Sequence, residues 1–323
     1  MRVLITGIDG FVGSHAAEYL LGINGMELHG THLPGQKTGN IDHLRGRITL
    51  HEADIVDAEA VRGIFLTVRP DKVVHLAGQA FVPAALRDPV GTLSVNIMGG
   101  VAVLDAARHQ AEAGGAGPDL LLVSSGEVYG KLNTEPVTEE SPVRPENPYA
   151  ASKASVDLIG QEYRRTFGVR VSVVRPFNHA GPRQSPVFVC SDFGRQFALI
   201  AAGKSRPEIL AGNLGARRDF TDVRDVVRAY WAILTHPSGH VVFNLCSGQV
   251  VAIRDLIDLF QEVSGVRVTV RSEPSRVRGG DAPLIAGRFA RLHEATGWKP
   301  TIPLRQTLAD VFAYWTTEIG SPG

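Results

Sequence analysis

One stretch near the N-terminus indicates the fold of this chain. It is Val-Leu-Ile-Thr-Gly-Ile-Asp-Gly-Phe-Val-Gly-Ser, residues 3–14. Its first four residues have the composition of a buried strand, and a helical pattern over residues 11–21 follows the glycine-rich turn. In such a turn Gly7 allows the tight bend, Gly10 lets a pyrophosphate approach the backbone, and Gly13 lets the helix pack close to the strand. The free N–H groups and the positive dipole at the helix start attract phosphate. A glycine-rich loop without a ligand would have the same composition, but the place at the first strand–helix junction favours a dinucleotide-binding site.

Short apolar runs alternate with helical patterns through the first half of the chain. The candidate strands are rich in Val, Leu and Ile and nearly continuously apolar; they are residues 3–6, 27–31, 48–52, 72–76, 120–124 and 171–175. Strands covered by helices on both faces have this composition. The amphipathic stretches between them include residues 11–21, 58–67 and 99–110. The sequence therefore predicts an α/β fold with a Rossmann-type, doubly wound parallel sheet.

The alternation of apolar runs and helical patterns ends after Pro176, where the predicted loops are longer and arginines are more frequent. A helical pattern at residues 223–234 and an apolar run at 242–245 return to the style of the first half. We therefore expect two domains that are discontinuous in sequence. Residues 1–176 with about 221–246 form the dinucleotide-binding domain, and residues 177–220 with about 247–323 form a smaller α+β substrate-binding domain.

Composition excludes several classes of protein. The 323 residues include 33 Lys+Arg and 33 Asp+Glu, and this zero net charge argues against nucleic acid as a partner. No apolar run approaches the ~20 residues needed to span a bilayer, so we expect a cytoplasmic protein without a membrane partner. The two cysteines, Cys190 and Cys246, lack metal-ligand spacing and the 11 histidines are scattered, so we expect no metal site.

Tyr149 and Lys153 are the first pair of candidate catalytic residues. They are four positions apart, so on a helix they face the same side. A nearby ammonium favours the tyrosinate, and we expect Lys153 to lower the pKa of Tyr149. The tyrosine would then exchange a proton with a carbonyl or an alcohol near neutral pH.

The sequence SSGEVYG, residues 124–130, follows the fifth predicted strand. Open α/β sheets bind ligands at this carboxyl end. We expect Ser125 to hydrogen-bond a substrate oxygen, with Ser124 as the neighbouring alternative. Glu127 is either a catalytic group that acts on the substrate or a carboxylate that stabilises the turn.

These three motifs together resemble the extended short-chain dehydrogenase/reductase family, whose glycines share the Gly-x-x-Gly-x-x-Gly spacing and whose members mostly act on nucleotide sugars. The resemblance covers nearly the whole chain and implies a Rossmann-fold enzyme with a triad of Ser125, Tyr149 and Lys153. The positions that match cofactor-binding residues of the family are Gly7, Gly10, Phe11, Val12, Gly13, His32, Asp54, Ile55, Leu76, Ala77, Gly78, Tyr149 and Lys153. The positions that match substrate-binding residues are Gln79, Asn178, Arg218 and Arg278.

The choice of nicotinamide cofactor stays open. An acidic residue at the end of the second strand would bond the ribose of NAD, but this chain has Gly-Thr-His-Leu-Pro at residues 30–34. His32 or Lys37 would meet a 2′-phosphate, or both are solvated loop residues. We therefore expect NADP(H) or NAD(H). Asp54 follows the third strand, where the family contacts adenine, and it also suits a helix N-cap.

Within the family, the stretches 175–182 (Arg-Pro-Phe-Asn-His-Ala-Gly-Pro) and 124–126 are similar to those of bacterial reductases that convert GDP-6-deoxy-4-keto-D-mannose to GDP-D-rhamnose. The resemblance implies reduction of a C4 ketone with Tyr149 as proton donor. Two positions depart from the pattern: Arg183 stands where a glycine is usual, and Gly279 replaces a common proline.

Two alternatives remain beside a reductase. GDP-mannose 4,6-dehydratases, and other nucleotide-sugar epimerases or dehydratases of the family, share the same framework. The dehydratases carry a Thr-Ser-Glu or Thr-Asp-Glu run, of which this chain keeps Glu127 but has Gly126 in the middle. A non-enzymatic nucleotide-binding protein of this fold would be expected to lack Tyr149 or Lys153, and both are present.

Two helical stretches of the chain bear on whether it forms an oligomer. Members of this family usually pair two helices, here residues 99–110 and 149–167, into a four-helix bundle between subunits. Both stretches have apolar faces, which predicts a homodimer. The same pattern also suits helices that are buried on the sheet.

Overall fold

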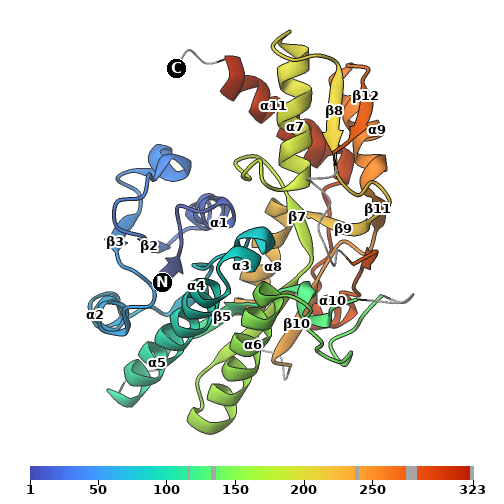
Figure 1. The fold of residues 1–323 in the computed structure, drawn as a ribbon. Helices are drawn as coiled ribbons and strands as arrows, with labels where there is room; N and C mark the ends of the chain where they lie inside the picture. The colour runs from blue at the N-terminus through green and yellow to red at the C-terminus, as the bar shows by residue number, and fades with distance from the viewer. Residues whose placement is uncertain (115–116, 132–135, 237–239, 274–281, 321–323) are drawn as a thin grey trace.

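Two lobes make up the computed structural model, which describes residues 1–114, 117–131, 136–236, 240–273 and 282–320 (Figure 1). The larger lobe holds a seven-stranded sheet in the order β10-β6-β5-β4-β1-β2-β3, with every neighbouring pair parallel. Its strands are β1 (Arg2–Thr6), β2 (Glu27–His32), β3 (Thr49–Glu52), β4 (Lys72–His75), β5 (Asp119–Val123), β6 (Val171–Pro176) and β10 (Val242–Leu245). The predicted Rossmann-type fold is confirmed.

Helices cover both faces of this sheet. On one face, α1 (Phe11–Leu21) and α8 (Val223–Thr235) share a core with Val3 and Ile5 of β1. On the other face, α2 (Ala58–Val68) and α5 (Gly99–Glu112) pack on Leu4, together with α6 (Pro148–Phe167). Successive strand residues alternate between the two cores, which is why the strands are apolar throughout. Two 3₁₀ turns, η1 (Gly39–Leu44) and η3 (Gly126–Tyr129), lie in the loops.

The connection from β4 to α5 is helical almost throughout. It contains α3 (Val82–Arg87), α4 (Pro89–Leu93) and a single π turn, η2 (Ser94–Met98). Residues 89–112 form the one stretch among the described residues that is long and apolar enough to cross a membrane. The expectation that no apolar run approaches this length was therefore wrong. Half of its most apolar window is buried inside the protein.

The smaller lobe holds two short sheets around its own core. One is β11-β9-β13 with β7 beside β9, and the other pairs β8 with β12. The elements are β7 (Asn178–Ala180), α7 (Val189–Ala201), β8 (Glu208–Ala211), β9 (Arg217–Asp222), β11 (Val250–Ala252), α9 (Ile253–Ser264), β12 (Thr269–Ser272), β13 (Leu284–Ile285) and α11 (Leu304–Gly320). Phe193, Phe197 and Phe260 fill the centre of this core. The remaining helix, α10 (Ala290–Thr296), packs against β10 and α8 of the larger lobe.

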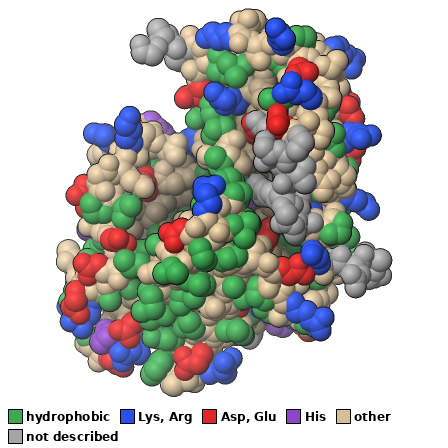
Figure 2. Space-filling model, viewed as in Figure 1, with side chains coloured by type: hydrophobic (Ala, Val, Ile, Leu, Met, Phe, Trp, Pro, Cys, Tyr) green, Lys and Arg blue, Asp and Glu red, His purple; other side chains and the backbone are tan. Residues whose placement is uncertain are grey.

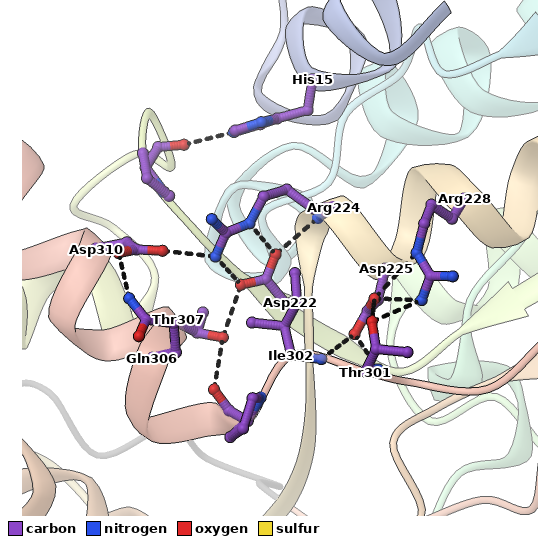
Figure 3. A network of polar contacts seen from close by, with 12 residues as sticks. His15, Asp222, Arg224, Asp225, Arg228, Thr301, Ile302, Gln306, Thr307 and Asp310 are labelled. Carbon is purple, nitrogen blue, oxygen red and sulfur yellow. Dashed lines mark hydrogen bonds and ion pairs between the residues drawn. The ribbon is translucent and has the colours of Figure 1, made fainter.

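Two aspartates at the start of α8 join the lobes (Figure 3). Asp222 caps the helix, pairs with Arg224 and accepts a hydrogen bond of 2.7 Å from Thr307 Oγ1 of α11. Asp225 is fully buried and accepts backbone hydrogen bonds from Thr301 and Ile302, at 2.8 and 2.9 Å. These contacts fix the C-terminal segment against the helix that underlies the large sheet.

Candidate active site

A cavity of about 680 Å³ lies between the two lobes at the carboxyl ends of the sheet strands. Fourteen of the predicted site residues line it: Gly7, Gly10, Phe11, Val12, Gly13, Leu76, Gly78, Gln79, Ser125, Glu127, Tyr149, Lys153, Asn178 and Arg218. The structure therefore brings the predicted cofactor, catalytic and substrate groups to one place.

The glycine turn is shaped for close backbone approach. Gly7 has a φ of +70°, and Cβ atoms at Gly10 and Gly13 would lie 3.2 and 2.3 Å from the Gly7 carbonyl oxygen. Gly10 precedes α1 without a side-chain cap, and the first turn of α1 has no acidic residue. The positive end of the helix therefore stays available for phosphate, and these residues fit a dinucleotide.

Ser125 and Tyr149, two of the predicted catalytic residues, lie together in the cavity wall. Ser125 follows β5, and its hydroxyl hydrogen-bonds with that of Tyr149 in the first turn of α6. Burial raises the pKa of Tyr149 to about 12; the Ser125 hydrogen bond lowers it in part, and the charge of Glu127 adds to the rise. Tyr149 is therefore protonated at neutral pH.

Lys153 lies one helical turn after Tyr149 and donates a hydrogen bond of 3.0 Å to the carbonyl oxygen of Val123. Burial lowers its pKa to about 8. Lys153 is not among the groups that shift the pKa of Tyr149. The expectation that Lys153 lowers the pKa of Tyr149 is therefore not met in this structure: burial raises that pKa, and the ammonium is engaged with a strand carbonyl.

Asn147 is a site residue that sequence analysis missed. Its side-chain oxygen accepts the N–H of Ala150 and so caps α6, while its amide donates to Glu127 Oε2 at 3.1 Å. The cap of α6 thus also orients the acidic side chain whose charge acts on Tyr149. An Asn directly before a helix-starting proline is the signal that would have found it.

The two serines have separate tasks. Both serines line the cavity, but the buried Ser124 hydroxyl donates to the backbone carbonyl of Lys153 at 3.2 Å, while Ser125 hydrogen-bonds Tyr149. The structure therefore supports Ser125 as the substrate-facing serine and gives Ser124 a packing contact.

Gln79 lines the cavity, but its side chain is engaged locally. Its amide hydrogen-bonds the backbone of Phe81 in both directions and donates to Thr92 Oγ1 at 3.0 Å. Its backbone N–H and carbonyl are held by Asn96, at 2.8 and 2.9 Å. Asn96, which sits in the π turn and also bonds Ser152, was not predicted.

Four predicted cofactor residues do not line the cavity. His32 ends β2, and its Nδ1 is buried without a hydrogen-bond partner among the described residues. Asp54 accepts the backbone N–H of Val56, and Asp57, not Asp54, caps α2. Ile55 packs in the core beside Gly99. Ala77 donates its backbone N–H to Thr6 Oγ1, beside the glycine turn.

The predicted substrate side of the cavity comes from the smaller lobe. Asn178 begins β7 and pairs in register with Phe220 of β9. Arg218 is buried in β9, where its Nη1 donates to the carbonyl of Arg217 at 2.9 Å. Tyr230 of α8 also lines the cavity and was not predicted; burial and the charge of Tyr149 raise its pKa. Arg278 lies outside the described residues.

Comparison with known proteins settles the family. A sequence model of the family described as GDP-mannose 4,6 dehydratase matches residues 4–311. The chain belongs to this family. It is 35% identical over 320 residues to a GDP-6-deoxy-D-mannose reductase of Pseudomonas aeruginosa, with 98% of each chain covered.

Solved structures of related proteins share the fold of this chain over nearly its whole length. RMD from Pseudomonas aeruginosa, complexed with NADPH, has a TM-score of 0.83 and 35% identity, covering 98% of this chain and 99% of that one. The UDP-glucose 4-epimerase of Thermus thermophilus, complexed with NAD, has a TM-score of 0.86 and 30% identity, covering 98% and 99%. Relatives with both nicotinamide cofactors thus share this architecture.

Proposed function

We propose that this protein is an NAD(P)H-dependent reductase of the C4 ketone of GDP-6-deoxy-4-keto-D-mannose and that its product is GDP-D-rhamnose. The observation that carries the proposal is the position of protonated Tyr149, hydrogen-bonded to Ser125, in the same cavity as the glycine turn. The full-length similarity to a GDP-6-deoxy-D-mannose reductase supports the choice of substrate.

The chain's own residues supply and hold the proton. A reduced nicotinamide supplies the hydride when it is bound. Tyr149 carries a proton that burial makes hard to lose to water but that a developing alkoxide at C4 accepts. Ser125 orients the carbonyl oxygen toward Tyr149. Lys153 lines the same cavity, and its ammonium, which is charged below about pH 8, favours the negative charge that develops as hydride reaches C4.

Both nicotinamide cofactors fit the residues present. The glycine turn and the start of α1 accept the pyrophosphate of either one. The strand β2 ends at His32 without the carboxylate that would select the ribose of NAD. We therefore infer use of NADP(H) or NAD(H).

The test is direct. The purified protein is mixed with GDP-6-deoxy-4-keto-D-mannose and NADPH or NADH, and nicotinamide absorbance is followed. Oxidation with GDP-D-rhamnose as product is the expected result. Tyr149→Phe should lower turnover by roughly 10²-fold or more while nicotinamide binding stays unchanged. An unchanged turnover in this variant would refute the assignment.

A second candidate, dehydration of GDP-mannose, rests on Glu127. Its carboxylate is close enough to Tyr149 to raise that pKa, and Asn147 holds it. A base at this point suits the abstraction of a proton beside a C4 ketone. Conversion of GDP-mannose to a keto sugar without net nicotinamide consumption, abolished by Glu127→Gln, would establish this activity.

We also propose a homodimer. Figure 2 shows hydrophobic side chains gathered over the α5 and α6 region of the larger lobe. The exposed apolar side chains of this region are Leu86, Val90, Met98 and Leu158. An exposed patch of this kind marks an interface. A mass of twice 34.7 kDa by light scattering, reduced to one chain by Leu158→Glu, is the expected result.

The cytoplasm remains our proposed location. Both cysteines, Cys190 and Cys246, are buried and free, as suits a reducing compartment. Fractionation of cells that express the tagged chain tests this.

A further inference from the structure

Arg183 has a backbone conformation that disfavours its side chain. Its φ is +71°, and Arg69 at φ +47° is the one other non-glycine residue with positive φ in the described part of the chain. Arg69 is the C-cap of α2, where left-handed residues are common. Arg183 lies in a loop of the smaller lobe at a position where sequence analysis expects a glycine. A side chain at this position therefore requires compensating contacts.

Those contacts cross to the larger lobe. The guanidinium of Arg183 donates to both carboxylate oxygens of Glu18 on α1, at 2.6 and 2.7 Å, and to His15 Nδ1 at 2.9 Å. Burial raises the pKa of Glu18, but the hydrogen bonds and charge of Arg183, with a hydrogen bond from His43 and the charge of His15, more than offset it and leave the pKa at about 2. A bidentate pair of this geometry fixes orientation as well as distance.

His15 also contacts the loop that carries Arg183. Its Nε2 lies 3.0 Å from the carbonyl oxygen of Pro182, the contact drawn in Figure 3. Because Arg183 donates to Nδ1, the proton of the ring is on Nε2, which donates to that carbonyl. Burial and the charge of Arg183 lower the pKa of His15 to about 4, so the ring is neutral. Glu18, Arg183, His15 and Pro182 thus form one closed set of contacts, which we call the Arg183 latch.

The latched loop leads into the cavity. Gln184 lines the cavity and donates to the carbonyl of His179 at 2.8 Å. The His179 ring stacks on Phe11 at 5.9 Å and 12° between planes. Phe11 is the first residue of α1, directly after Gly10. Residues 179–183 of the smaller lobe therefore contact α1 at three points. These are the first residue of the helix, Phe11, and then His15 and Glu18, one and two turns later.

We propose that Arg183 is a positioning residue, because the Arg183 latch sets the distance and angle between β7 with the loop that follows it, together called loop 178–184, and the start of α1. This inference rests on the proposed reductase function. Hydride transfer requires the donor carbon and the C4 carbon to meet in one narrow geometry, and small displacements lower the rate steeply. Loss of the latch should therefore slow the chemical step while each ligand still binds its own lobe.

The test compares Arg183→Gly with Arg69→Gly. Both substitutions place glycine at a positive φ, but only the first removes the latch. We expect Arg183→Gly to lower kcat by about tenfold or more, with the Kd for NADPH changed less than about twofold. Arg69→Gly should leave kcat unchanged. Glu18→Gln in the Arg183→Gly background should lower kcat no further, because the two residues act as one unit. An Arg183→Gly enzyme with wild-type kcat, whatever its melting temperature, overturns the proposal.

Hydrogen exchange separates failure of this inference from failure of the proposed function. NADPH binding to the wild-type chain should protect amides of the glycine turn and also of loop 178–184. In Arg183→Gly the glycine turn should still be protected, and the loop should lose that protection. This readout needs no sugar substrate, so it holds even if the wild type does not reduce the GDP sugar. Equal loop protection in both proteins overturns the inference.

Discussion

Lys153 Nζ donates a hydrogen bond of 3.0 Å to the carbonyl oxygen of Val123, at the end of β5. The lysine has no carboxylate partner in the part of the chain that the structure describes, and burial alone lowers its pKa to about 8. Below that pH the folded protein holds an unpaired ammonium in its interior. A buried charge of this kind opposes folding. Its presence therefore indicates that Lys153 has a functional role and not a stabilising one.

Lys153→Met should stabilise the protein and inactivate it. The removed charge is unfavourable at pH 7, and the lost hydrogen bond offsets part of the gain, so the free energy of unfolding should rise by roughly 1–2 kcal/mol. Turnover should fall by about 10²-fold or more. Thermal unfolding and nicotinamide oxidation measure both effects. A clear loss of stability would show that the Val123 hydrogen bond outweighs the cost of burying the charge.

The pH dependence of turnover should follow Lys153 and not Tyr149. Tyr149 keeps its proton to about pH 12, whereas Lys153 loses its charge as pH rises through about 8. The rate of ketone reduction should therefore fall above about pH 8. Stability should rise in the window from about 8 to 10.5, because there the unfolded lysine binds a proton that the folded one does not. Lys153→Arg keeps the charge, so its rate should show no descending limb near pH 8.

Gly13→Ala should weaken cofactor binding. The new Cβ would lie 2.3 Å from the carbonyl oxygen of Gly7 and 2.8 Å from Ile8 Cα, so the turn itself must shift. The Kd for NADPH, measured by fluorescence, should rise by about tenfold or more. Gly63→Ala in α2 is the matched control, because nothing lies within 4 Å of its Cβ. That variant should bind NADPH normally, and normal binding by Gly13→Ala would contradict the assigned phosphate cradle.

Asp225→Ala should destabilise the whole fold. The buried carboxylate accepts two backbone N–H groups of the segment 301–302 and the guanidinium of Arg228. Leaving those donors without acceptors should lower the free energy of unfolding by about 3 kcal/mol. Urea unfolding measures the loss. Asp42→Ala removes an exposed ion pair with Arg45 and should change stability little. Equal effects of the two substitutions would show that the contacts of Asp225 are dispensable.

The elements of the larger lobe could be predicted because local pattern and tertiary burial agree there. The bounds Phe11–Leu21 of α1 and Val242–Leu245 of β10 match the prediction. Continuous apolar runs between glycines indicate buried parallel strands, and an amphipathic repeat indicates a covering helix. The meeting of Ser125, Tyr149 and Lys153 in one cavity also follows, because Ser125 comes directly after β5 and the other two lie one turn apart on α6, which packs on the same sheet.

The features that depend on distant partners could not be predicted. Asp54 and Asp57 are equally good caps by composition, and only the local turn decides for Asp57. Asn96 meets Gln79 because a π turn rotates it inward, and no sequence signal marks that turn. The pKa of Tyr149 depends on burial that the i,i+4 spacing does not report.

The place of β10 in the sheet has a consequence for synthesis. β10 pairs with β6, yet about 65 residues that form much of the smaller lobe separate the two strands in the chain. As the protein emerges from the ribosome, the backbone groups of β6 that will bond β10 stay unpaired until residue 245 has been made. An open strand edge invites pairing with another chain. The nascent protein is therefore most prone to aggregate during this interval, and mutations that delay the smaller lobe should lower soluble yield even when the finished fold is stable.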